Sequence, residues 1–351
     1  MRNHEPSAEP RSCTRLIRLA SVSPEREIGA VASLAQRAGS SALVIADLAG
    51  DSAALGRFQR PGRSKSAHEH RRLTGGRSTR YGDGIVSLCA LAPTAQAWLD
   101  EPSALSGPRL LNRLVRGLLA GLARLGLAAS YPGRDFVTVN GRRIAYVSLS
   151  RAASGVLLFQ AVLGVASPYT TAERDPTWPG LPAAPEPTWL ARERLPVPNF
   201  ERIAAALAAG FAERFELELE KTPLSSDDER AIASASRPPL VDASLAELVS
   251  AGAIATPIGE LETHVALDDG GRLARVRLLG DMIAGQPELQ ALEAALVGEL
   301  PESQRVRELC TVWLANPAAL VIGLTDAAVL ADSVARSARA CSVTSSSSGS
   351  A

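Results

Sequence analysis

The sequence predicts an α+β fold in two domains, and three observations support this prediction. Apolar residues recur at spacings of three and four between Gly107 and Gly126, which is typical of a helix with one buried face. Three runs of strand-forming residues follow, and Asn140-Gly141 between the first two is a strong signal for a two-residue hairpin turn. A second hairpin signal, at 268–271, lies nearer the C-terminus. With 351 residues, the chain exceeds the usual size of one domain.

The first hundred residues predict one helix and two buried strands. Residues 24–38 are expected to be helical, because Pro24 suits a first helical position and Gly39 suits the position after the last turn. The apolar runs at 41–49 and 85–93 are short enough to be buried strands.

The middle of the chain predicts a hairpin, a third strand and two further helices. The strand-forming runs are DFVTVN, RRIAYVSLS and GVLLFQAVLGV. Residues 168–198 contain many prolines and are expected to form a long ordered loop. Helices are predicted at about 200–215 and 227–236, and beyond the second hairpin at 287–300 and about 325–338.

A composition break at SRPPL, residues 236–240, indicates a domain boundary. Both ends of the chain lack the apolar residues that would offset the entropy of ordering. We therefore predict a disordered N-terminus (1–13), a larger domain (14–236), a smaller domain (237–340) and a disordered Ser-rich tail (341–351).

Charge and cysteine content exclude several classes of function. The 37 basic and 37 acidic residues balance, so neither nucleic acid nor an anionic membrane is expected as a partner. No apolar run approaches the roughly 20 residues that span a bilayer, and the polar N-terminus does not resemble a signal peptide. The four cysteines are widely spaced without a CxxC pair, so we expect no metal site. These features predict a cytoplasmic protein.

The segment HRRLTGGRSTRYGDG, residues 70–84, is a candidate anion-binding turn. Gly75 and Gly76 allow positive φ angles and a close approach of backbone N–H groups to a ligand. Arginines on both sides supply planar forks that match phosphate oxygens. A solvated basic loop is the alternative interpretation. The Walker pattern GxxxxGK[ST] and the dinucleotide pattern GxGxxG are both absent from this turn.

Several segments, taken in order, resemble the lipoate–protein ligases, whose catalytic domain is shared with the biotin ligases. They are ALGRFQ, RRLTGG, the helix LLNRLVRGLLAGLARLG, and GRD…VNGRRIA…SGVLLFQ. The segment GGRLARVRLLGDMIAGQPELQALEAALVGEL resembles the accessory domain of the same enzymes. The resemblance extends over about residues 24–340.

The resemblance implies a mixed-sheet catalytic domain followed by a small α+β accessory domain. It implies that ATP, with Mg²⁺, activates lipoate or octanoate to an acyl-AMP, and that a lysine of a lipoyl carrier domain then accepts the acyl group. The apolar runs 85–93 and 156–165 are candidate walls of an acyl tunnel, although burial in the core explains most of their residues equally well.

The residues that contact the nucleotide and the acyl-adenylate in the family correspond to two places in this sequence, the diglycine turn and a later short motif. Arg134 and Asp135 correspond to the family's "GrnD" step, and Asp135 is a predicted contact. The catalytic position falls on Arg143. The turn residues predicted to bind are Arg72, Gly75, Gly76, Arg77, Ser78 and Thr79.

Two departures from the family pattern keep several functions open. Arg77 replaces the third glycine of the turn, and Arg143 replaces the catalytic lysine. Arginine keeps the charge but differs from lysine in bulk and geometry. Tyr146 stands where the family has a glycine and would crowd the site if it points inward. The first hypothesis is a divergent ligase, and the alternative is a non-catalytic relative that binds an acyl ligand or a carrier domain. A further alternative is an octanoyl- or lipoyltransferase using a cysteine such as Cys89.

Overall fold

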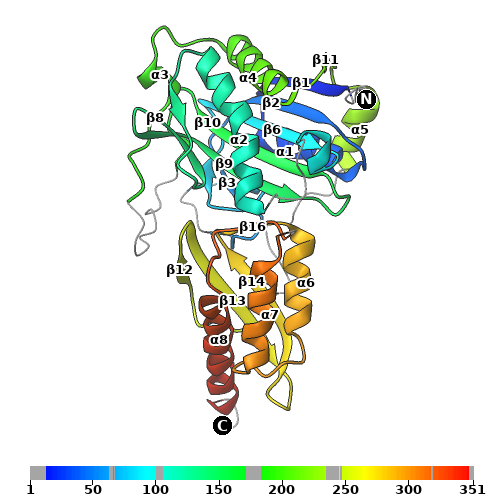
Figure 1. The fold of residues 1–351 in the computed structure, drawn as a ribbon, viewed down its shortest axis with the longest axis vertical. Helices are drawn as coiled ribbons and strands as arrows, with labels where there is room; N and C mark the ends of the chain where they lie inside the picture. Colours follow the sequence, from blue (N-terminus) through cyan, green and yellow to red (C-terminus); the bar gives the residue numbers. More distant parts are fainter. Residues whose placement is uncertain are drawn as a thin grey trace, which may run out of the picture.

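The computed structural model contains two packed units, the larger above the smaller in Figure 1. It describes residues 13–62, 66, 68–99, 106–170, 183–234, 245, 247–317 and 319–347. The predicted domain boundary at 236 lies outside these residues, and so does the N-terminal segment except for Cys13. Both remain predictions.

The larger unit is built on an eight-stranded mixed sheet with the order β11-β1-β2-β6-β10-β9-β8-β7. β1 pairs in parallel with β2 and with β11, and the other neighbours are antiparallel. The mixed sheet confirms the predicted α+β class. Its strands are β1 (Thr14–Val22), β2 (Ala42–Leu48), β6 (Ile85–Ala92), β7 (Ala129–Ser130), β8 (Phe136–Val139), β9 (Arg142–Arg151), β10 (Leu157–Gly164) and β11 (Leu219–Lys221).

Two layers cover the faces of this sheet. α2 (Gly107–Arg124) and α4 (Phe200–Phe215) pack on one face, and their glycines allow close contact, since a Cβ at Gly210 would lie 2.2 Å from the backbone nitrogen of Gly121. α1 (Pro24–Gln36) and α5 (Ser226–Ser234) lie on the other face. That face also carries a small sheet of β3 (Ala53–Leu55), β4 (Glu69–Arg71) and β5 (Thr79–Arg80). Two short helical segments, η1 (Ala95–Ala97) and α3 (Leu190–Glu193), lie in loops.

The smaller unit packs three helices on a three-stranded sheet around a core of its own. Its strands are β12 (Ile254–Thr256), β13 (Gly259–Leu267) and β14 (Leu273–Gly280), and its helices are α6 (Gln286–Leu296), α7 (Gln304–Ala315) and α8 (Ala327–Ser347). The two-stranded ribbon of β15 (Ile283–Ala284) and β16 (Val321–Ile322) lies against the larger unit, at the junction in Figure 1.

Apolar side chains join the two units. Ile258, Ile283 and Ile322 of the smaller unit belong to the same buried cluster as the leucines of α2. A cluster that crosses the junction buries apolar area only when the units are packed together, so it stabilises their relative position.

Most predicted elements are present, and the main differences are a first strand, a late helix and the end of the last helix. The hairpin at Asn140-Gly141 is confirmed, with φ angles of 50° and 74° and the pair Val139↔Arg142 flanking the turn. β1 and α7 were not predicted. α8 continues to Ser347, beyond the expected end at 338 and into the segment predicted to be a tail. Within the described residues, no helix is both long and apolar enough to cross a membrane.

Candidate functional site

The diglycine turn connects β4 and β5 and lies over β9 of the large sheet. The backbone N–H of Arg72 donates to Leu55 O at 2.9 Å, and the N–H of Arg57 donates to Thr74 O at 2.9 Å. These bonds tie both ends of the turn to β3 and the segment after it. The turn is therefore part of the small sheet, with its path set before any ligand binds.

Arg72 is fully buried and braces the turn from within. Its guanidinium donates to Thr79 Oγ1 at 2.8 Å and to the carbonyl oxygen of Arg77 at 2.7 Å. It also lies 4.6 Å from the centre of the Tyr146 ring. A guanidinium used in this way holds the shape of the turn, and in this conformation its forks point at the protein's own oxygens.

Gly75 and Gly76 are also engaged by the protein. Tyr146 and Ser148 on β9 donate their hydroxyls to the carbonyl oxygen of Gly75, at 2.8 and 2.9 Å. The backbone N–H of Gly76 donates to Met282 O of the smaller unit at 2.8 Å. The turn is therefore held between the sheet and the smaller unit, and the N–H of Gly76 is not directed at an open site.

Arg77 makes an ion pair with Asp135, the residue before β8. Its Nε lies 2.8 Å from Oδ2 and its Nη2 lies 3.2 Å from Oδ1 of Asp135, whose side chain is completely buried. Two of the predicted binding residues thus neutralise each other. Ser78 and Thr79, which follow in the turn, are buried as well.

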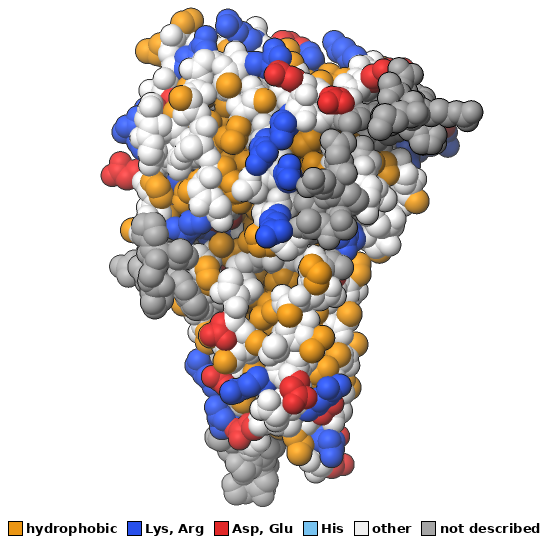
Figure 2. Space-filling view, in the orientation of Figure 1, with side chains coloured by type: hydrophobic (Ala, Val, Ile, Leu, Met, Phe, Trp, Pro, Cys, Tyr) orange, Lys and Arg blue, Asp and Glu red, His pale blue; other side chains and the backbone are white. Residues whose placement is uncertain are grey.

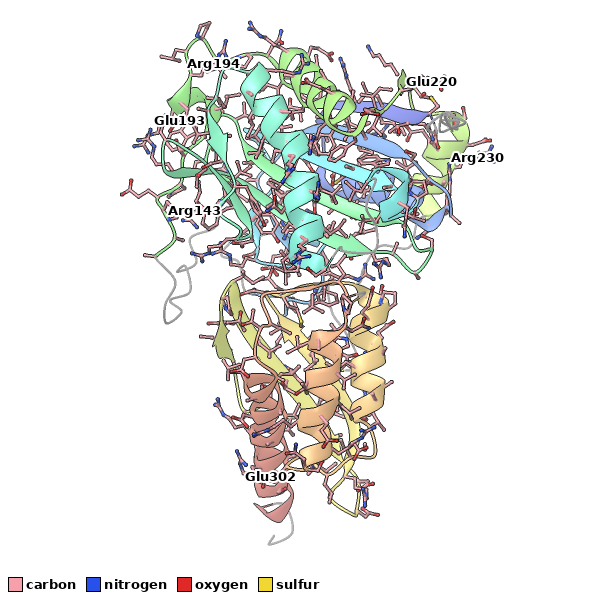
Figure 3. The ribbon with its side chains drawn as sticks, in the orientation of Figure 1. Arg143, Glu193, Arg194, Glu220, Arg230 and Glu302 are labelled. Atoms are coloured by element: carbon pink, nitrogen blue, oxygen red, sulfur yellow. The ribbon has the colours of Figure 1, made fainter. Side chains whose placement is uncertain are left out.

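Arg143 lies at the start of β9, near the junction of the units, and Figure 3 labels it low on the larger unit. Only 5% of the residue is exposed. Its backbone pairs with the segment at Glu186 and Thr188, and its guanidinium carbon lies 5.9 Å from the centre of the Phe136 ring. The one lysine among the described residues, Lys221, is on β11 at the far edge of the sheet, and Lys65 lies outside them.

Arg72 and Arg143 lie on one face of the sheet with two aromatic rings between them. Tyr146, under Arg72, is the register partner of Phe136, under Arg143. The structure brings Arg72, Arg77, Asp135 and Arg143 to one region of the sheet, and their role in binding a nucleotide or an acyl-adenylate stays a prediction. Each guanidinium lies over one ring of this pair.

A buried polar cluster beneath the turn was not predicted from the sequence. Glu27 of α1 accepts hydrogen bonds from Tyr81 Oη at 2.7 Å and from Ser87 Oγ at 2.8 Å. Gln160 donates to Tyr81 at 3.0 Å and accepts from Thr74, next to Gly75, at 2.6 Å. Burial raises the pKa of Glu27, while the bonds from Tyr81 and Ser87 oppose the rise. The one sequence signal for this cluster was Glu27 itself, a charged residue next to Ile28 on the buried face of the helix.

The candidate tunnel walls turn out to be core. Every residue of β6 and β10 is buried, and their apolar side chains lie in the two hydrophobic clusters on either face of the sheet. Cys89 of β6 is buried beside Glu27, and burial raises the pKa of its thiol well above the ordinary range.

These residues do not fit ATP with Mg²⁺ in the arrangement observed. A phosphate cradle needs free backbone N–H groups and guanidiniums directed outward, whereas Gly76, Arg72 and Arg77 are bonded to Met282, the turn and Asp135. In the part of the chain that the structure describes, no three histidine, cysteine or acidic side chains are grouped as a metal site would require.

The comparisons with known proteins rest on structure alone. No protein-family model matches the sequence, and no curated protein matches it. LipL1 of P. falciparum, solved with lipoate, is 11% identical with a TM-score of 0.59, over 88% of this chain and 95% of that one. Lipoate-protein ligase A bound with ATP (13% identical) and protein Ta0514 of T. acidophilum with bound lipoic acid (14%) each reach 0.50, over 64% of this chain and 94% of theirs.

At these identities the likeness concerns the fold. The large mixed sheet is the feature that the sequence resemblance predicted. The chain has the fold of the lipoate–protein ligases.

Proposed function

We propose that this protein binds a medium-chain acyl group of the lipoate or octanoate class, free or on a carrier domain, and does not activate it as an acyl-adenylate. One observation carries the second part of this proposal, the absence of acyl-adenylate formation: the diglycine turn is closed on the protein itself. Its Gly76 N–H donates to Met282, and its Gly75 carbonyl accepts from Tyr146 and Ser148. The choice of acyl class is supported by relatives of the same fold that bind lipoic acid or lipoate.

The residue at the catalytic position supports the same proposal. Adenylation joins a carboxylate oxygen to the α-phosphorus of ATP and releases pyrophosphate. In the family, the lysine is the compact cation that bridges the two reacting groups. Arg143 carries the charge on a larger planar group, and its guanidinium lies against Phe136. Exchange of lysine for arginine at a tight site changes the distances on which positioning depends.

An active ligase is the second candidate, and one observation favours it. Arg72, Arg77 and Arg143 lie on the same side of the sheet, so a movement of the turn away from Met282 would present three cations to one ligand. A solved protein of this fold holds ATP. We keep this candidate because the closed turn is held by a small number of hydrogen bonds.

Cysteine-dependent acyl transfer has less support. A nucleophilic cysteine needs access to substrate and a thiolate at neutral pH. Cys89 is 1% exposed with a raised thiol pKa, and burial raises the pKa of Cys310 to about 11.

A carrier domain would find a cationic face on α2. Arg109, Arg113, Arg116 and Arg124 are spaced so that they share one side of the helix, and α2 contains no acidic residue. Arg124 pairs with Glu213 of α4, so the other three arginines are the ones that would meet a partner. Figure 2 shows a row of basic side chains on the front of the larger unit, where α2 lies in Figure 1. This arginine row is complementary to a partner with an acidic surface.

The test combines a reaction with a titration. Purified protein is incubated with ATP, Mg²⁺ and either lipoate or octanoate, and pyrophosphate is measured. We expect no release above the protein-free background, and saturable binding of lipoate in calorimetry without ATP. Pyrophosphate formed in proportion to lipoate would establish the second candidate instead. Absence of saturable lipoate binding would remove the acyl-binding proposal.

A further inference from the structure

A large cavity lies between the two units, away from the diglycine turn. Its volume is about 800 Å³. The larger unit contributes the start of α2, the loop before β8, and β8 itself. The smaller unit contributes the turn before β13 and the segment from the end of α7 to the start of α8. Because the cavity has walls from both units, it exists only while they are packed together.

The walls are tightly built on both sides of the junction. A Cβ on Gly107, at the start of α2, would lie 2.9 Å from the backbone nitrogen of Val321. A Cβ on Gly323 would lie 2.2 Å from Ile258 Cγ1. Ile258 and Ile322, both buried, also belong to the cluster that joins the units. The residues around the cavity are therefore closely packed against each other across the junction.

The lining is mainly apolar and contains one cation. Phe136, Ile258, Leu314 and Ile322 are among the apolar side chains, together with several prolines. Arg134 is the one charged residue among the described residues of the lining. Its guanidinium carbon lies 5.1 Å from the centre of the Phe136 ring, and that of Arg143 lies 5.9 Å from the same ring. Two cations thus flank one aromatic wall.

We propose that this cavity binds a long-chain fatty carboxylate, with its alkyl chain along the apolar walls and its carboxylate at Arg134. A mainly apolar pocket with one polar anchor is the usual form of a small-molecule site. Octanoate has ten non-hydrogen atoms, which at roughly 30 Å³ each would occupy less than half of this volume. A chain of about 14 to 18 carbons fills it better, by the same rough measure.

This inference goes beyond the proposed function and is independent of it. The proposed function concerns lipoate or octanoate and the absence of adenylation. The cavity concerns a longer ligand, in a pocket that meets the candidate site at Phe136. Pyrophosphate release would overturn the former and leave the latter, whereas failure of long-chain binding would have the opposite effect.

The first experiment compares chain lengths and head groups. Equilibrium dialysis with radiolabelled hexadecanoate, tetradecanoate and octanoate gives the dissociation constants for the full chain. We expect affinity to rise by about fourfold for each buried methylene between octanoate and hexadecanoate. Hexadecanol should bind more weakly than hexadecanoate, because it lacks the charge that Arg134 recognises. Equal affinity for octanoate and hexadecanoate would overturn the proposal.

The second experiment locates the site with matched variants. Arg134→Gln should weaken hexadecanoate binding by about tenfold, leave hexadecanol unchanged, and be rescued by Arg134→Lys. Arg202→Gln, an exposed arginine on α4, is its control. Ala315→Trp places a large ring in the lining and should reduce binding at least tenfold, whereas Val312→Trp, exposed on the same helix outside the lining, should not. Unchanged affinity in both Arg134→Gln and Ala315→Trp would overturn the proposal.

Discussion

The phenol oxygen of Tyr146 lies 2.8 Å from the carbonyl oxygen of Gly75, so the central sheet holds the diglycine turn directly. The resemblance places a glycine at the position of Tyr146, and a glycine could make no such bond. Burial raises the pKa of Tyr146, which keeps its hydroxyl protonated as a donor. One exchange of glycine for tyrosine therefore both fills the space under the turn and fastens the turn in place.

Gly76→Ala should destabilise the protein strongly. Gly76 has a φ of 87°, and a Cβ there would lie 1.8 Å from Tyr146 Oη. Strain and overlap together should lower the free energy of unfolding by about 3 kcal/mol or more. Urea unfolding at fixed pH measures the change.

Gly133→Ala is the matched control for that variant. Gly133 has a similar φ of 83°, but a Cβ there would meet nothing within 4 Å. It should therefore cost only the conformational strain, about 1 kcal/mol. Equal losses in the two variants would show that Tyr146 does not press against the turn.

Asp135→Asn should be as damaging as a core substitution. Asp135 is completely buried, and its carboxylate neutralises Arg77. Removing one partner leaves a buried charge without compensation, which costs about 3–5 kcal/mol. Replacing both residues together, as Arg77→Leu with Asp135→Leu, should recover much of this loss. If Asp135→Asn alone is as stable as the parent, solvent screens the charges of Arg77 and Asp135. Asp227→Asn, in an exposed pair with Arg230, should be nearly neutral.

The sequence predicts the frame of the site well because that frame depends on local signals. Asn140-Gly141 adopts the positive φ angles that its hairpin requires, and this turn sets the position of Arg143 on β9. The periodic leucines of α2 belong to the hydrophobic cluster on that face of the sheet or pack against it. The order of these elements along the chain was enough to identify the fold.

The sequence does not predict how the site is filled, because that depends on contacts between distant residues. Arg77 and Asp135 are 58 positions apart, and neither shows in isolation that the other neutralises it. The bond from Gly76 to Met282 crosses between the units, and the sequence contains no signal for it. The cluster around Glu27 likewise joins α1 with two strands of the sheet. For this reason the sequence shows Arg77 and Gly76 as candidate phosphate ligands but does not show their bonds to Asp135 and Met282.

Arg143→Lys alone should not produce a ligase. The lysine would regain its compact charge, but Tyr146 would still fill the space below the turn and Gly76 would still be bonded to Met282. Pyrophosphate release with ATP and lipoate is expected to stay at background. If this single variant releases pyrophosphate, the closed turn is not the barrier to adenylation.

Glu27→Gln should flatten the pH dependence of stability. Burial raises the folded-state pKa of Glu27 above its ordinary value of about 4.3. As pH rises past that value, the unfolded chain loses its proton first, so the parent loses stability until the folded-state pKa is reached. Glutamine does not titrate, so the variant does not lose stability in this way. In urea unfolding between pH 4 and 8, the free energy of unfolding of the parent should fall relative to that of the variant as pH rises. Parallel pH profiles would contradict the raised pKa of Glu27.

Charge reversal on α2 tests the carrier-domain part of the proposal. Arg109→Glu with Arg116→Glu replaces two exposed cations of the arginine row, so affinity for a purified acidic lipoyl carrier domain should fall by at least tenfold at low salt. Added salt should narrow the difference, because exposed charges are screened over about 10 Å at 0.1 M. Arg230→Glu, exposed on α5 across the sheet, is the control and should bind like the parent. Binding that is the same in all three proteins would place the carrier domain on another face.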